Sequence, residues 1–331
     1  MKVVITGGTG FIGSRLALDS LQKGYSVTLV GQENNATESQ NRRLIELKGG
    51  QVVICSVNDR EKIVEALKDA DVVYHLAAAQ HEAHLSDKTF WDVNVEGTKN
   101  VLEASLAAGI KRFIHGSTIG VYGTALDGKL DELSPVKPDN IYGVTKLQAE
   151  SLVRSFQDKL PIVIIRISET YGPGDHRLLK LFRAIDNNVF LRIGSGQNIH
   201  HLIYIKDLIE GLNLASHRDE AVGRVFVLSG NDALTTSKMI DVIAAELGKK
   251  VPRVGLPLPP FLALATAVET LCRPLGIQPP LHRRRMDFFR KSFQFSQKQA
   301  REVMGFDPRV SFIEGVAETA KWYRSIGYLN H

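Results

Sequence analysis

Cysteine is nearly absent from this chain of 331 residues, which contains only Cys55 and Cys272. Two cysteines cannot form the disulfide framework of a small secreted domain, so we expect a soluble, cytoplasmic protein in a reducing compartment. Hydrophobic residues make up 44% of the chain and charged residues 23%. This ordinary globular composition excludes a disordered chain and predicts a sizeable core.

Long hydrophobic runs are also missing. The most apolar segment, 256–271, contains prolines and Glu269 and is shorter than the ~20 apolar residues of a membrane span. We therefore expect no transmembrane segment, and the start of the chain does not resemble a signal peptide. The net charge of +5 is too diffuse to predict a nucleic-acid partner, although it suits anionic ligands. We expect a small-molecule substrate and no metal site.

Short runs rich in valine and isoleucine alternate with amphipathic stretches in the first half of the chain. This alternation predicts an α/β fold, with a Rossmann-like doubly wound parallel sheet covered by helices on both faces. We expect a dinucleotide-binding domain over 1–172 and a smaller, mixed substrate lobe over 173–331, of which about 200–230 could return to the first domain. The expected strands are 3–6, 26–30, 51–55, 71–76, 112–115 and 162–167, with further candidates at 202–205 and 225–228. The expected helices include 11–23, 61–68, 95–108 and 144–160.

A glycine-rich turn follows the first expected strand. Gly7 permits a tight turn, Gly10 allows a pyrophosphate to approach the backbone, and Gly13 allows the helix and strand to pack closely. The backbone N–H groups of Phe11, Ile12 and Gly13 then begin a helix, whose N-terminus attracts phosphate. We expect NAD or NADP here.

The residues after the second expected strand leave the choice of cofactor open. An acidic residue would bind the ribose hydroxyl of NAD, and an arginine would bind the 2′-phosphate of NADP. The chain has Gly31 at the strand end, with Glu33 shortly after it and Arg42 and Arg43 further on. Glu33 could reach the ribose, and Arg42 or Arg43 could reach a 2′-phosphate if the loop folds back. All three could equally be solvated loop residues.

Two further segments indicate the chemistry. Tyr142 and Lys146 are four residues apart, on one face of an expected helix. An ammonium near a phenol favours the phenolate, which can exchange a proton with a substrate hydroxyl. Ser117 and Thr118 follow the fifth expected strand, at the sheet edge where ligands bind in this class of fold.

These motifs together resemble the extended short-chain dehydrogenase/reductase family, the NAD-dependent epimerase/dehydratase group. The resemblance runs nearly end to end, and its features include the glycine turn, Tyr142 with Lys146, and the segments 75–78, 94–98, 171–174, 204–207 and 298–308. It implies that Thr118, Tyr142 and Lys146 are catalytic and that Lys146 also holds the nicotinamide ribose. It further implies cofactor contacts at Asp59, Leu76, Ala77 and Ala78. Asn94 matches a family asparagine that serves helix geometry or proton relay, and a homodimer is a family expectation.

Several positions depart from the family pattern. The 4,6-dehydratases resemble one another in an Asp-Glu pair after the catalytic threonine, where this chain has Ile119 and Gly120, so dehydration is disfavoured. The 4-epimerases resemble one another in an arginine that holds the diphosphate, where this chain has His200 and His201. Arg285 loosely matches a second phosphate-binding arginine. The tentative substrate residues are Ser117, Thr118, His200 and Arg285.

Two further departures concern recognition of the ligands. Glu169 stands where the family has an asparagine in the substrate lobe. Ser56 stands where the family has an acidic residue after the third strand.

The resemblance implies an NAD(P)-dependent oxidoreductase or epimerase acting on a secondary alcohol or ketone, with a nucleotide sugar as the leading substrate. The alternative is a 3β-hydroxysteroid or sterol type of dehydrogenase or reductase acting on an apolar alcohol. A non-catalytic NAD(P)-binding sensor is less favoured, because such proteins tend to lose the tyrosine or lysine. The segment 256–271 is interpreted first as the core of the small lobe, and otherwise as an apolar pocket or a peripheral membrane contact near 283–285.

Overall fold

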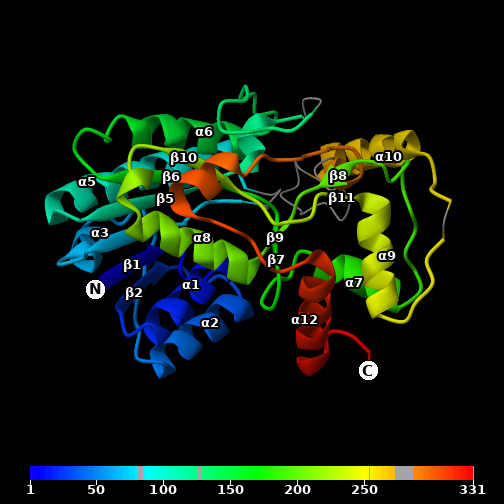
Figure 1. Cartoon of the computed structure of the whole chain (residues 1–331), viewed down its shortest axis with the longest axis horizontal. Helices are drawn as coiled ribbons and strands as arrows, with labels where there is room; N and C mark the ends of the chain where they lie inside the picture. The colour runs from blue at the N-terminus through cyan, green and yellow to red at the C-terminus, as the bar shows by residue number, and fades with distance from the viewer. Residues whose placement is uncertain (81–84, 125–127, 253, 273–285, 331) are drawn as a thin grey trace.

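A seven-stranded parallel sheet forms the larger part of the molecule (Figure 1). The computed structural model describes residues 1–80, 85–124, 128–252, 254–272 and 286–330. The strand order is β10-β6-β5-β4-β1-β2-β3, in which the direction of winding reverses between β1 and β4, as in a doubly wound sheet. The strands are β1 (Lys2–Thr6), β2 (Ser26–Gly31), β3 (Gln51–Ile54), β4 (Val72–His75), β5 (Arg112–Thr118), β6 (Ile162–Ile167) and β10 (Val225–Leu228).

Helices cover both faces of this sheet, and each face has its own core. Successive strand residues point to opposite faces, so Val3 and Ile5 join one apolar cluster while Val4 joins the other. The first cluster includes residues of α1 (Phe11–Gln22), α2 (Ala36–Leu47) and α8 (Ile205–His217). The second includes residues of α3 (Arg60–Leu67), α5 (Gly97–Ala108) and α6 (Ile141–Arg154).

The smaller part of the molecule is mixed. Two pairs of short strands, β7 with β9 and β8 with β11, lie beyond the main sheet, surrounded by helices. The strands are β7 (Thr170–Tyr171), β8 (Ile199–His200), β9 (Ile203–Tyr204) and β11 (Leu234–Thr235). The helices are α7 (Leu179–Asp186), α9 (Thr236–Glu246), α10 (Leu258–Cys272) and α12 (Phe312–Ser325).

The doubly wound α/β class is confirmed, although some boundaries differ from those predicted. Helix α6 begins three residues earlier than expected, because the Asn140 side chain accepts a hydrogen bond from the N–H of Gly143 and caps it. Strand β5 runs on to Thr118, since its last three residues still pair with β6. The stretch 202–205 contributes β9, which pairs with β7 outside the main sheet.

The segment 256–271 does not form the core of the small lobe. It forms most of α10, in which Ala265 is the one buried residue among those described. Across the described residues, no helix is both long and apolar enough to cross a membrane.

Candidate active site

The glycine turn after β1 has the geometry expected of a phosphate-binding turn. Gly7 has φ +68°, and a Cβ there would lie 2.7 Å from the N atom of Ala77. A Cβ on Gly13 would lie 2.4 Å from the carbonyl oxygen of Gly7, so α1 packs directly on the turn. A Cβ on Gly10 would meet the Gly7 oxygen at 3.2 Å and no other atom within 4 Å. The backbone at Gly10 is therefore open on the side from which a ligand would approach.

The first turn of α1 can bind an anion. Gly10 is the N-cap of this helix, and no side chain caps it. The N–H groups of Phe11, Ile12 and Gly13 are the first three of the helix, which have no acceptor within the helix itself. With the positive end of the helix dipole behind them, these groups fit the pyrophosphate of a dinucleotide.

The chain after β4 borders the same turn. The N–H of Leu76 donates to the carbonyl oxygen of Thr6 at 3.1 Å, and the N–H of Ala77 donates to the Thr6 hydroxyl at 3.3 Å. Leu76, Ala77 and Ala78 are each half-buried. This stretch is fixed beside the glycine turn, where the resemblance predicts cofactor contacts.

The charged residues after β2 pair with each other. The Arg42 guanidinium lies 2.8 Å from the Glu33 carboxylate and 3.0 Å from that of Glu46. Hydrogen bonds from Ser39 and from Arg42 hold the pKa of Glu33 below its ordinary value. Glu33 is thus an ionised carboxylate near the end of β2, while Arg42 is already bound to two carboxylates.

Asp59 has a structural partner. Its side chain accepts a hydrogen bond from the N–H of Lys62 at 3.3 Å and caps α3. The Lys62 ammonium lies 3.2 Å from the same carboxylate. A cofactor contact by Asp59 stays a prediction, since the cap accounts for an acidic residue here without any ligand.

Thr118 and Tyr142 both lie close to Gly120. A Cβ built on Gly120 would lie 3.4 Å from the Thr118 hydroxyl oxygen and 3.9 Å from Cδ1 of Tyr142. The start of α6 is held against this turn, because a Cβ on Gly143 would lie 2.6 Å from the Gly120 oxygen. The hydroxyl of Thr118 accepts a hydrogen bond from the N–H of Gly120 at 3.1 Å, which leaves its own proton available to donate.

Lys146 lies one helical turn beyond Tyr142 and is 1% exposed. Its Nζ atom lies 3.5 Å from Nε2 of His115. Burial lowers the pKa of Lys146 to about 8, against the opposing effect of Glu150. Burial also lowers the pKa of His115 and lowers that of His75 to about 3. At neutral pH, Lys146 is therefore mostly charged beside neutral imidazoles.

The side chain of Ser117 is hydrogen-bonded in the protein interior. Its hydroxyl donates to Glu150 at 2.5 Å, and the side chain is buried. Arg166 binds the two oxygens of the same carboxylate at 3.1 and 2.9 Å. This network accounts for Ser117 without a ligand, so a substrate contact by Ser117 stays a prediction. Sequence reasoning missed Glu150, although its spacing of four residues from Lys146 places it on the same helix face.

His200 and His201 also have hydrogen-bond partners within the protein. His200 is buried, with Nδ1 3.0 Å from Glu169 and Nε2 3.1 Å from the Thr236 hydroxyl. His201 accepts a hydrogen bond from the N–H of Phe295 on Nδ1, so its Nε2 carries the proton and donates to a backbone oxygen. Both imidazoles thus have partners within the protein, and a substrate contact by His200 stays a prediction. Arg285 lies outside the described residues.

Asn94 links the two halves of the site. Its amide accepts from the N–H of Ala79 at 2.7 Å and donates to the hydroxyl of Thr145 at 3.0 Å. Asn94 lies in a π-helical turn, Asp92–Glu96, and is 1% exposed. This buried amide fixes the loop after β4 against α6, which favours the geometric role over proton relay.

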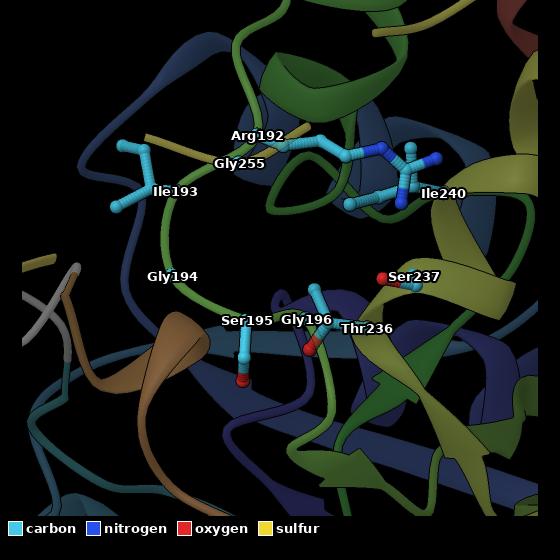
Figure 2. Close-up of a pocket in the computed structure, with 9 residues that line it drawn as sticks. All are labelled: Arg192, Ile193, Gly194, Ser195, Gly196, Thr236, Ser237, Ile240 and Gly255. Atoms are coloured by element: carbon cyan, nitrogen blue, oxygen red, sulfur yellow. The ribbon is translucent and has the colours of Figure 1, made fainter. Parts of the chain in front are cut away.

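A small pocket in the smaller part of the molecule lies between the loop 192–196 and the start of α9 (Figure 2). Its glycine-rich rim suggests an anion site, but the helix N–H groups are already used. The N–H groups of Thr236, Ser237 and Lys238 donate to Asn198, Gly196 and Thr235 respectively. Thr236 also contacts His200 through its hydroxyl, so the start of α9 is engaged within the protein and offers no free N–H group to a phosphate.

Comparisons with known proteins agree with this architecture. Residues 3–229 match the model of the NAD dependent epimerase/dehydratase family. The low-salt glycan biosynthesis protein Agl12 of Haloferax volcanii is 32% identical, over 74% of this chain and 84% of its own. An N-acetyl-α-D-glucosaminyl-diphospho-ditrans,octacis-undecaprenol 4-epimerase of Escherichia coli O157:H7 is 28% identical, over 78% of this chain and 76% of its own. The crystal structure of UDP-glucuronic acid 4-epimerase from Bacillus cereus in complex with NAD has a TM-score of 0.79 and 25% identity, with 98% of this chain and 99% of that one covered.

Proposed function

The chain belongs to the NAD dependent epimerase/dehydratase family, and from this we propose that it oxidises and re-reduces a secondary alcohol of a sugar carried on a diphosphate. A nucleotide sugar is the leading substrate. The observation that carries the proposal is the placement of Thr118 and Tyr142 close to Gly120, with the buried Lys146 one helical turn away.

Side chains of this protein transfer the proton of the substrate hydroxyl. Tyr142, as the phenolate, takes the proton from the substrate hydroxyl, and Thr118 donates a hydrogen bond to the same oxygen. The positive charge of Lys146 stabilises the phenolate. Bound NAD would supply hydride transfer in both directions, and the glycine turn and Lys146 are the residues that would hold it. Tyr142 returns the proton to the substrate oxygen when the ketone is reduced, and reduction on the opposite face of the ketone gives the epimer.

Dehydration is not part of this proposal. Elimination of water from the sugar needs an additional acid and base, and the positions after Thr118 hold Ile119 and Gly120. Ile119 is buried in an apolar cluster with Val121 and Tyr122. A proton-transferring side chain is therefore missing at these positions, whereas epimerisation needs none there.

NAD is the proposed cofactor, in preference to NADP. The family is described as NAD dependent. The ionised carboxylate of Glu33 would accept hydrogen bonds from a ribose hydroxyl and would repel a 2′-phosphate. Arg42, the alternative phosphate partner, is bound to Glu33 and Glu46.

A second candidate is an NAD-dependent dehydrogenase of an apolar alcohol. The observation that favours it is Glu169, whose carboxylate pairs with His200 where a diphosphate sugar would need a cation. A carboxylate at this position weakens the binding of a diphosphate and does not affect an uncharged substrate.

We also retain the proposal that the substrate lobe begins near residue 173.

Product analysis separates the two candidates. The purified chain is incubated with NAD and a panel of nucleotide sugars, and then with sterol-like alcohols. We expect an epimer to form from one sugar, without net accumulation of NADH. Stoichiometric NADH formation with an apolar alcohol would instead support the second candidate.

Two tyrosine variants control this experiment. Tyr142→Phe should abolish the conversion, while Tyr25→Phe should retain it, because Tyr25 pairs with His217 on α8, away from the site. If neither class of substrate is converted, or if Tyr142→Phe converts it at the rate of the parent, the proposed function is wrong.

A further inference from the structure

Two buried histidines lie side by side in the main sheet. His75 and His115 are register partners on β4 and β5, and their ring centroids are 5.5 Å apart. Both side chains are fully buried. The residues two positions before them, Val73 and Phe113, belong to the apolar cluster that includes residues of α6. Because alternate strand residues point to the same face, both imidazoles lie on the side of the sheet that α6 covers.

Both nitrogen atoms of His75 are hydrogen-bonded. The Thr98 hydroxyl donates to the carbonyl oxygen of Asn94 at 2.7 Å, so it accepts from Nε2 of His75 at 2.8 Å. Nδ1 of His75 then accepts from the Thr6 hydroxyl at 2.7 Å. His75 is therefore a satisfied core histidine, whose ring is fixed by two threonines.

His115 differs from its neighbour in its partners. Its Nε2 atom lies 3.5 Å from Nζ of Lys146, and its Nδ1 atom has no hydrogen-bond partner among the described residues. An ammonium can only donate, so Nε2 accepts and the proton of the ring lies on Nδ1. Burial and the charge of Lys146 lower the pKa of His115, which keeps the ring neutral. The polar contact that offsets the burial of this imidazole is therefore the ammonium of Lys146.

Several titratable or charged groups lie in or beside this cluster. They are His75 on β4, His115 on β5, Tyr142 and Glu150 on α6, and Arg166 on β6. Glu150 attracts Lys146 by its charge and opposes the lowering of the pKa of Lys146, but its carboxylate is bound by Arg166. His75 is neutral, since burial lowers its pKa to about 3. His115 is thus the neutral acceptor that the ammonium meets at hydrogen-bond distance.

We propose that His115 is a positioning residue, whose Nε2 atom accepts a hydrogen bond from Lys146 and holds the ammonium in place. One of the three N–H donors of the ammonium is then directed into the interior, and two remain for the phenolate of Tyr142 and a ribose hydroxyl. Because His115 is fully buried, it acts on the reaction through Lys146. The consequence for the reaction rests on the proposed function, whereas the hydrogen bond itself does not.

Combined variants of the two residues test the hydrogen bond. His115→Gln retains an acceptor near the Nε2 position, while His115→Phe retains a ring without an acceptor. Each form of residue 115 is prepared with Lys146 and with Lys146→Met, and free energies of unfolding in urea are compared from pH 6 to pH 10. The difference within each pair isolates the titration of Lys146, because the titration of other groups is common to both members.

The titration midpoint of Lys146 is the quantity to compare. In the parent it should lie near the pKa of about 8 that burial gives this lysine. We expect His115→Gln to keep this midpoint and His115→Phe to lower it by about one pH unit, the size expected for a hydrogen bond to a charged group.

A matched control removes another buried imidazole. His201 is 5% exposed and lies between β8 and β9, outside the main sheet. His201→Phe should leave the midpoint of Lys146 unchanged. If His115→Phe does not fold, His115→Asn replaces it, because its shorter amide ends near the Nδ1 position and not at Nε2.

The dependence of kcat on pH tests the consequence for the reaction. The pH above which kcat falls should be lower by about one unit in His115→Phe, because Lys146 then loses its proton at lower pH. The charged fraction of Lys146 at pH 8 falls from about one half to about one tenth, so kcat at that pH should fall about fivefold. KM should change little, and His115→Gln should retain the kcat of the parent.

Equal midpoints in His115→Gln and His115→Phe would overturn the proposal. Different midpoints with identical kcat profiles would overturn the positioning role. If the parent converts no substrate, the proposed function is wrong, and the titration still decides whether His115 holds Lys146.

Discussion

The buried ammonium of Lys146 should make the protein less stable at neutral pH than a variant without that charge. Burial lowers the pKa of Lys146 from its ordinary 10.5 to about 8 in the folded protein. Each pKa unit corresponds to about 1.4 kcal/mol, so the buried charge destabilises the folded state by about 3 kcal/mol at pH 7. The unfolded chain binds this proton more tightly. The penalty is therefore complete below pH 8, shrinks as the pH rises towards 10.5, and is absent above that value.

Lys146→Met tests this reasoning, because it keeps a linear side chain and removes the charge. The free energy of unfolding is measured by urea denaturation at pH 7, 8, 9 and 10, without cofactor and with two-state behaviour verified at each pH. We expect the parent to gain about 2–3 kcal/mol relative to the variant between pH 7 and pH 10. Comparing the two proteins at each pH cancels the titration of other groups.

The control is Lys298→Met, at a side chain that is 78% exposed and hydrated in both states. Its difference from the parent should stay constant over the same range of pH. A difference between parent and Lys146→Met that is also constant would refute the buried, charged state of Lys146, and with it the electrostatic support of the phenolate.

Three further variants test the proposed roles in the site. Tyr142→Phe should lower kcat by roughly 10²–10⁴-fold and leave the Kd for NAD unchanged, because it removes the group that exchanges the proton; an unchanged kcat would exclude Tyr142 as acid and base. Gly10→Val should abolish NAD binding in calorimetry while the protein stays folded by circular dichroism, since its side chain would occupy the open side of the turn; normal affinity would mean that the cofactor binds elsewhere. Glu33→Gln should weaken NAD binding and improve NADP binding relative to the parent, because it removes the repulsive charge and leaves Arg42 with one carboxylate partner, Glu46, in place of two. Unchanged dissociation constants for both cofactors would show that neither residue reaches the ribose.

The parallel sheet could be predicted because its signals are local. Buried strands rich in valine and isoleucine alternate with helical periodicity, and the glycine turn marks the first crossover. The end of β5 was harder to predict, since Gly116, Ser117 and Thr118 resemble a loop in composition. Their strand conformation comes from pairing with Ile165, Arg166 and Ile167 of β6, about 50 residues away, which no local pattern reveals.

The partners of the predicted substrate residues could not be predicted from the sequence, because they lie far away along the chain. His200 matches the family's arginine in position, but its ring contacts Thr236 and the backbone of Phe288, 36 and 88 residues further along the chain. The exposure of α10 could not be predicted from the sequence either. An apolar run in a sequence predicts burial, and only the packing of the other elements decides whether there is something to bury it against.

The charges beneath the site explain why Tyr142 and Lys146 can differ in exposure on one helix. Glu150 continues their helix face and is paired with Arg166, so it attracts Lys146 without leaving a net negative charge in the core. The lysine is thereby held in the interior, while the start of α6, which carries Tyr142, stays half-buried against the turn at Gly120. A charge on the buried side of a phenol stabilises the phenolate without occupying the side from which a substrate must arrive. Since Ser117 and Arg166 are both buried, we predict that removing either would act on the reaction through the position of Lys146.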